Sequence, residues 1–226
     1  MDVSRDRIVE LAATQGHDLA HLPGASFSEV LRVPDEIQRS ASAQAAAEVH
    51  GISDDEIVLG ATFPESWARF LAFAEACSNN VLHEFGEDTD EELLPSRPPD
   101  VRPTVCCAAH NGGRFDFAVL LFECQRHNLS FSPFRQWLFV DTLHLLDCVK
   151  TELGGACLKL QCLISTMTEA RALRGHRALD DSIALRHVVH NVACKLDCSV
   201  TDLLRKFAYR WDEQASIPQI AALVED

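Results

Sequence analysis

The chain has 226 residues, of which 47% are apolar, and its 34 acidic and 20 basic residues give a net charge of −14. This length and apolar content suit one α/β domain with a hydrophobic core. The negative charge argues against a broad groove that holds nucleic acid by neutralising phosphates. It leaves open a small site in which bound metal supplies the positive charge.

Composition also indicates the cellular compartment of the protein. No apolar stretch of about eighteen residues is present, so we expect no membrane span and no membrane partner. The first residues lack the basic and apolar segments of a signal peptide. The nine cysteines include no Cys-x-x-Cys pair and several lie in apolar runs, which predicts reduced thiols that act as small core residues. We therefore expect an intracellular protein, in the cytoplasm or the nucleus.

The first hundred residues carry clear boundary signals. Ser53 and Glu56 form a capping-box pattern at a helix start, and Gly51 ends the alanine-rich segment before it. Periodicity and turn residues predict, in chain order, hairpin strands over 7–13 and 27–33, helices over 40–50 and 65–78, and an acidic, proline-rich loop over 83–103.

The second half alternates between strand and helix patterns. It predicts a buried strand over 105–109, a helix over 115–128, a strand over 138–142, and helices over 158–164, 181–194 and 200–209. A hairpin followed by such alternation predicts a mixed sheet flanked by helices. We assign residues 5–195 to one α/β domain and residues 196–226 to a C-terminal helical extension.

Asp116 is the first candidate for chemistry. It follows a predicted strand and a tight turn, Asn111-Gly112-Gly113, and it precedes a helix. Binding sites in open α/β sheets lie outside the carboxyl ends of strands, and glycines let the backbone approach a ligand closely. The alternative is that Asp116 only caps the helix after the turn, and the local sequence slightly favours that interpretation.

His176 and Asp181 form the second candidate, since Asp181 opens a predicted amphipathic helix and His176 lies just before it. Together they could be a general base beside a metal ligand. The alternative is a solvated histidine and a helix-capping aspartate.

A third set, His187, His190, Cys194 and Cys198, has residue types that bind zinc. One straight helix spreads such residues over roughly 16 Å, too far for one ion, so core cysteines and partly exposed histidines are favoured.

Three segments in this order resemble the DEDDh exonucleases, a family that includes RNase T, the three-prime repair exonucleases and the proofreading subunit of bacterial replicative polymerase. They are Ala109-His110-Asn111-Gly112-Gly113-Arg114-Phe115-Asp116-Phe117, Val140-Asp141-Thr142-Leu143 and His176-Arg177-Ala178-Leu179-Asp180-Asp181. The first is most similar to the three-prime repair branch. The resemblance covers residues 5 to about 195 and implies a ribonuclease H-like fold, with a mixed five-stranded sheet flanked by helices.

The resemblance also implies an activity, the removal of nucleotides from the 3′ ends of single-stranded DNA or RNA with two Mg²⁺ or Mn²⁺ ions. Carried over residue by residue, Asp116 and Asp181 are metal ligands and His176 is the general base. The substrate-binding residues are His110, Asn111 and Arg114. A homodimer is compatible with this assignment.

One family motif has no match. The family carries Asp-x-Glu on a central strand that precedes the segment matched by residues 6–12, and this sequence has only five residues there, without such a pair. Loss of that strand predicts an open slot between two unpaired strands, and loss of its acids predicts weak metal binding. Glu10 is not assigned as a replacement ligand.

Three explanations are open: a shortened copy of an active enzyme, a degenerate member that binds nucleic acid or protein without cleaving, or a first strand supplied by another chain. Because the other motifs are intact, the sequence favours an N-terminally shortened 3′–5′ exonuclease, with an inactive interaction module as the alternative.

Overall fold

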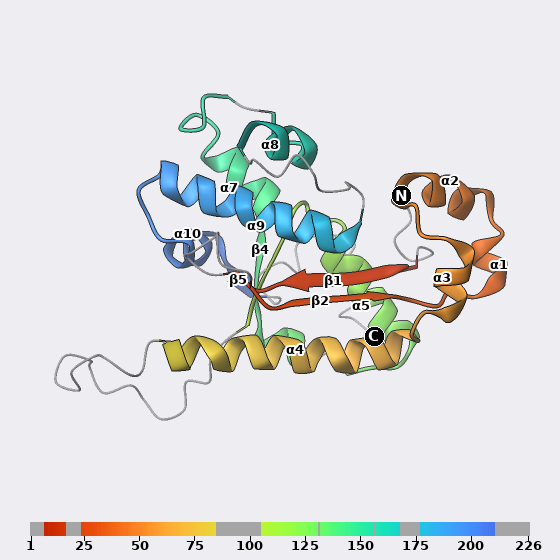
Figure 1. The fold of residues 1–226 in the computed structure, drawn as a ribbon. Helices are drawn as coiled ribbons and strands as arrows, with labels where there is room; N and C mark the ends of the chain where they lie inside the picture. The colour runs from red at the N-terminus through yellow and green to blue at the C-terminus, as the bar shows by residue number, and fades with distance from the viewer. Residues whose placement is uncertain are drawn as a thin grey trace.

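The computed structural model describes residues 7–16, 24–84, 105–130, 132–155, 157–167 and 177–210, with the backbone alone for 79–84. It is a mixed α/β structure, as the sequence predicts (Figure 1). The elements are β1 (Glu10–Thr14), β2 (Ser26–Val30), α1 (Asp35–Gln38), α2 (Ala41–His50), α3 (Asp54–Leu59), α4 (Phe63–Glu84), β3 (Cys106–Ala109), α5 (Asp116–Arg126), α6 (Ser132–Gln136), β4 (Leu138–Asp141), α7 (Thr142–Cys148), α8 (Leu160–Met167), α9 (Ala178–Lys195), α10 (Val200–Phe207) and β5 (Tyr209–Arg210).

Local capping explains where the early helices begin and end. The Ser40 hydroxyl accepts a hydrogen bond from the Ala43 amide at the start of α2, and Gly51 ends that helix in the left-handed conformation, with φ 65°. Ser53 and Glu56 form the predicted capping box at the start of α3. The predicted boundaries at Gly51 and Ser53 are confirmed. They were predictable because each is set by residues only a few positions apart.

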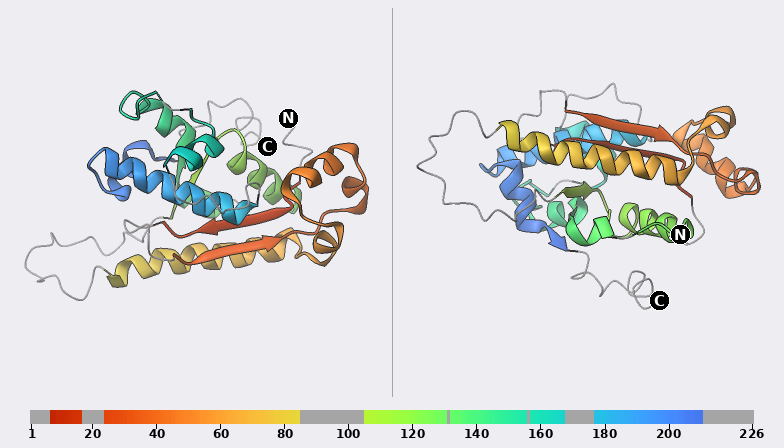
Figure 2. Two further views of the ribbon diagram at one scale, coloured as in Figure 1. Left: turned by 45° about the horizontal axis from the view of Figure 1, so that its top comes forward. Right: turned by 90° about the horizontal axis from the view of Figure 1, so that it is seen from below.

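The first sheet is a hairpin of β1 and β2, paired antiparallel. Helix α9 packs against β1 and α4 packs against β2, so that the hairpin lies between two helices (Figures 1 and 2). The second sheet has the order β3-β4-β5, with β3 parallel and β5 antiparallel to β4. Tyr209, predicted as the last helical residue, instead lies in β5 beside Phe139. Residues 211–226 lie outside the described part of the chain.

The prediction of one five-stranded sheet is not what the described residues show, because their strands form two separate sheets. Among these residues, β1 pairs only with β2 and β3 pairs only with β4. Residues of both β1 and β3 line one large cavity. This cavity therefore lies between the two sheets.

The two largest apolar clusters among the described residues hold the layers together. The first packs α4, α5, α6 and β4 around stacked aromatic rings, with Trp67 and Phe134 centred 5.4 Å apart. The second joins β4, α7, α8, α9 and α10 through fully buried residues such as Leu145, Val188 and Val192. Aromatic pairs of this kind add about 1 kcal/mol each to the burial of apolar area.

All nine cysteines are free thiols. Cys124 is fully buried, as predicted, whereas Cys106 and Cys148 are exposed and are not core residues. None of the helices in the described ranges has the length and apolar composition needed to cross a membrane.

Candidate functional site

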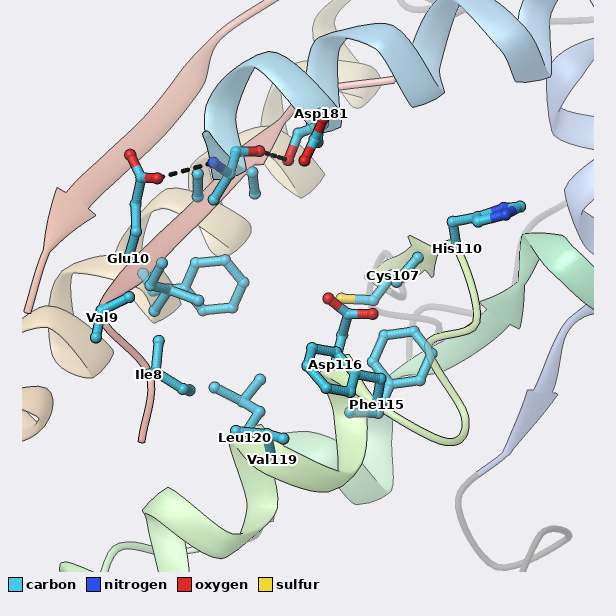
Figure 3. Close-up of a pocket in the computed structure, with 18 of the residues that line it drawn as sticks. Ile8, Val9, Glu10, Cys107, His110, Phe115, Asp116, Val119, Leu120 and Asp181 are labelled. Carbon is cyan, nitrogen blue, oxygen red and sulfur yellow. Dashed lines mark hydrogen bonds between the residues drawn. The ribbon is translucent and has the colours of Figure 1, made fainter. Parts of the chain in front are cut away.

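A cavity of about 2610 Å³ lies between the two sheets, lined by β1, β3, α4, α5 and α9. Asp116 at the start of α5 and Asp181 in the first turn of α9 lie on opposite sides of it (Figure 3). The structure thus brings two of the three residues singled out for catalysis to one cavity. The third, His176, lies outside the described residues.

Neither aspartate is the helix cap that the alternative interpretation required. The N-cap of α5 is Phe115, which makes no side-chain capping hydrogen bond, and Asp116 is the first helical residue. The N-cap of α9 is Arg177, four residues before Asp181. Both aspartates instead lie in the first turn of their helices, where a carboxylate stabilises the helix dipole without an N-cap hydrogen bond.

The Asp116 carboxyl has a perturbed pKa. Its side chain is exposed to the cavity, but protein atoms crowd around it, and this loss of hydration raises its pKa from 3.8 to about 6. The negative charges of Asp141 and Asp181 raise it further, while a backbone hydrogen bond opposes the shift. Asp116 and Asp181 thus place two negative charges on one cavity, and the pKa of Asp116 is raised. A bound cation would relieve the repulsion between these charges.

The raised pKa of Asp116 predicts a pH-dependent gain in stability when its charge is removed. Because the folded pKa lies above the ordinary value, ionised Asp116 destabilises the fold, fully above about pH 6 and not at all below about pH 4. Asp116→Asn should therefore raise the free energy of unfolding by about 1 kcal/mol at pH 7.5, a modest gain because solvent in the cavity screens the charge. Urea unfolding of both proteins at pH 4.5 and 7.5 measures this; a gain that is larger at pH 4.5 contradicts the assignment.

Asp181 is placed by a contact between residues far apart in sequence. The Glu10 carboxylate in β1 accepts a hydrogen bond from the Ala178 amide, at 2.8 Å, where α9 begins. It also accepts hydrogen bonds from the Arg177 guanidinium, at 3.1 to 3.3 Å. Figure 3 shows Glu10 turned toward the start of α9 rather than toward Asp116. Glu10 is thus a positioning residue that ties α9, and with it Asp181, to the first sheet.

The loop between β3 and α5 is held by Asp141, which the sequence did not single out as a site residue. Its carboxylate accepts hydrogen bonds from the amides of Asn111 and Gly113, at 3.0 and 3.1 Å, and from the Leu143 amide at 3.0 Å. These bonds fix the turn in which Asn111 has a φ of 64°. A strand that ends in Asp-Thr before a helix is an N-cap signal, and this pattern could have identified Asp141.

Removal of the Asp141 charge should loosen this loop. Asp141→Asn replaces an acceptor oxygen by a donor that faces backbone amides, so the free energy of unfolding should fall by about 1–3 kcal/mol. Asp147→Asn on α7, the helix that Asp141 caps, is the matched control, because its side chain is exposed, and it should change the free energy of unfolding by less than about 0.5 kcal/mol. Urea unfolding of both variants measures this, and equal effects would contradict a positioning role.

The residues expected to bind substrate lie at two places. His110 lines the large cavity; its Nδ1 lies 3.2 Å from the Thr142 hydroxyl, and burial lowers its pKa below 6.5. Asn111 and Arg114 instead line a smaller pocket of about 470 Å³ beside α7. His110 therefore lines the same cavity as the two aspartates, but its ring is turned away from them (Figure 3), and Asn111 and Arg114 line the smaller pocket.

The metal-binding capacity of the described residues is limited. No group of three or more His, Cys, Asp or Glu side chains that could hold a metal ion occurs among them. Of the residues considered for zinc, His190 Nε2 and Cys194 Sγ lie 3.4 Å apart, one turn along α9. Asp116 and Asp181 supply hard oxygen donors of the type that Mg²⁺ and Mn²⁺ prefer, and they face one cavity from opposite sides.

A scan against models of known protein families and a search of curated proteins found no match to this chain.

Proposed function

We propose that the chain hydrolyses phosphodiester bonds at nucleic-acid 3′ ends with a divalent cation, as a member of the DEDDh exonuclease class. The observation that carries this proposal is the placement of Asp116 and Asp181 on one cavity, where burial, with a smaller contribution from the charge of Asp181, raises the pKa of Asp116 to about 6. The order of the sequence motifs supports it. The ribonuclease H-like sheet, with its first central strand missing, is part of the same proposal.

The cation, Mg²⁺ or Mn²⁺, would be held between Asp116 and Asp181, where it would polarise the phosphate and lower the pKa of a bound water. Around it, Glu10 and Arg177 fix the start of α9, and Asp141 fixes the loop before α5. His110, whose pKa is lowered by burial, is held against the Thr142 hydroxyl at the edge of the cavity. With two carboxylates, metal affinity is expected to be weak.

A nuclease assay tests the proposal. A 5′-labelled single-stranded oligonucleotide, DNA in one arm and RNA in another, is incubated with Mg²⁺ or Mn²⁺ and the chain. The same assay is run on a second protein, the chain extended upstream by a strand that carries Asp-x-Glu. Stepwise shortening of the oligonucleotide from its 3′ end by either protein is the expected result, and addition of EDTA should stop it. Absence of shortening from both proteins would overturn the proposal.

His176 is assigned as the general base by the family resemblance. In whichever form of the protein is active, His176→Ala should slow hydrolysis by roughly a hundredfold or more, because proton transfer from the attacking water loses its acceptor. His187→Ala on α9 is the matched control and should leave the rate unchanged. Single-turnover rates over a range of pH measure this; equal rates for wild type and His176→Ala would remove His176 from the site.

A second candidate function, a module that binds nucleic acid or protein without cleaving, is favoured by the absence of a three-residue metal group among the described residues. Fluorescence anisotropy of a labelled oligonucleotide in EDTA distinguishes the two. Binding in EDTA together with no hydrolysis in Mn²⁺ would support this candidate, whereas metal-dependent shortening would exclude it.

A further inference from the structure

We propose that the cavity between β1 and β3 is a docking site for an extended peptide strand of another protein, which pairs with both sheet edges through main-chain hydrogen bonds and places a carboxylate beside Arg186. This inference rests on the same gap between β1 and β3 in which the proposed function places a missing strand, but it concerns the sheet edges and not the aspartates. Addition of a strand to an open edge is a common mode of peptide recognition.

The first edge is β1. The Leu31 amide donates to the Val9 carbonyl and the Gln15 amide donates to the Ala25 carbonyl, so residues 9 and 15 are the ones bonded to β2. Because antiparallel strands alternate, the backbone groups of residues 10, 12 and 14 point to the opposite side, toward the cavity. No described strand pairs with them there.

The second edge is β3. The Leu138 amide donates to the Val105 carbonyl, and Cys106 lies opposite Leu138 in the parallel register. The alternation of a parallel pair turns the backbone groups of Cys106 and Ala108 away from β4. Here too, no strand within the described ranges pairs with them. The cavity is thus bounded by two rows of backbone donors and acceptors, for which a strand is the matching shape.

The walls are apolar, and the β3 wall is the least covered. The four residues of β3 are Cys-Cys-Ala-Ala, and none is buried, whereas Phe139 and Val140 in the neighbouring β4 are fully buried. Helix α9 contributes Leu185 and Val189 to the lining, and α5 contributes Leu120. The volume of about 2610 Å³ also exceeds the roughly 300–1,000 Å³ of an ordinary small-ligand pocket. An occupant with side chains on both faces is required to fill it.

The positive charge of Arg186 predicts an acidic residue in the docked strand. Two guanidinium nitrogens of this cavity-lining residue, Nε and one Nη, are buried and have no hydrogen-bond partner among the residues that the structure describes. The same Nη lies 2.7 Å, and the Gln15 carbonyl oxygen 2.6 Å, from the point where a side chain on Gly24 would begin. The guanidinium therefore lies near the end of β1. A buried cation without a partner is costly, and a carboxylate at that end of the docked strand would pair with it.

These features specify the occupant. β1 has five residues and β3 has four, so the docked segment pairs over about five residues. It is apolar on both faces, because helices lie on both sides of the hairpin, and it lacks proline, since its amides must donate. Its one acidic side chain lies near the end that meets Arg186.

The experiment uses fluorescein-labelled peptides of about seven alternating valine and threonine residues, blocked at both ends. One set carries glutamate at the first or last position, and a second set carries lysine there. Anisotropy is measured without metal or nucleic acid. At least one glutamate peptide should bind about tenfold or more tightly than its lysine counterpart, because its charge pairs with Arg186. In Arg186→Glu this preference should reverse, and in Arg135→Glu, an exposed control outside the cavity, it should not change.

Amide hydrogen exchange locates the bound peptide. The amides of Glu10, Ala12, Thr14, Cys106 and Ala108 should become protected when the glutamate peptide binds. Absence of peptide binding, binding that Arg186→Glu does not alter, or protection elsewhere would each overturn the proposal. Since the readout needs neither metal nor hydrolysis, a failed nuclease assay does not bear on it, and a failed peptide assay leaves the proposed hydrolysis untouched.

Discussion

Asp116→Asn and Asp181→Asn should each lower metal-dependent hydrolysis by about a thousandfold or more without loss of the fold. A cation held by carboxylates supplies several kcal/mol of transition-state stabilisation, and removal of either charge takes away one of the two carboxylates that the proposed function assigns to the cation. The fold should survive because both side chains face the cavity, and the raised pKa of Asp116 marks its charge as a cost to stability.

Asp180→Asn is the matched control for this result, because it removes a carboxylate next to Asp181 that does not line the cavity. Its hydrolysis rate should equal that of the wild type. Single-turnover rates in Mn²⁺, with urea unfolding in parallel, measure both properties. A larger loss for Asp180→Asn than for Asp181→Asn would show that the wrong aspartate has been assigned.

Glu10→Gln should lower the free energy of unfolding by about 2–3 kcal/mol, the largest stability effect that we expect. The Glu10 side chain is only 6% exposed, and its carboxylate pairs with Arg177 while it accepts the first amide of α9. The substitution removes a charge-assisted pair and a negative charge from a helix N-terminus, and it leaves a guanidinium near a neutral group. Because Asp181 lies one turn further along α9, hydrolysis should fall as well.

The hairpin supplies the control for Glu10. Glu29 in β2 makes a similar two-bond pair with Arg69, at 2.6 and 2.9 Å, but the Arg69 side chain is 50% exposed. Glu29→Gln should therefore cost less than about 1 kcal/mol. Urea unfolding of the two variants compares a covered pair with an exposed one. Equal costs would mean that Glu10 does not hold α9 in place.

Elements defined by nearby residues were predictable from the sequence. The capping box at Ser53, the left-handed Gly51 and the apolar period of α4 all act within a few positions, and the structure has each of them. The short β5 was not predictable, because Tyr209 continues a helical pattern and becomes a strand residue only by pairing with Phe139, seventy positions earlier. Separation into two sheets likewise depends on which strands pair, and a local sequence pattern does not determine that pairing.

The candidate site shows the same division. The turn at Asn111 and the aspartate after it were visible, because a strand, two glycines and a helix start adjoin there. The true start of α9, at Ala178 rather than at Asp181, was not visible, since the side chain that meets it comes from Glu10, 168 positions away. Local spacing therefore identifies candidate ligands, but long-range hydrogen bonds decide which of them share a cavity.

Mn²⁺ titration calorimetry at pH 7.5 tests the central claim most directly, namely that Asp116 and Asp181 together hold a divalent cation. The wild type and Asp180→Asn should bind one Mn²⁺ with the same weak affinity, with a Kd on the order of 1 mM, whereas Asp116→Asn and Asp181→Asn should show no binding. Equal Mn²⁺ binding by all four proteins, or none by the wild type, would contradict the account.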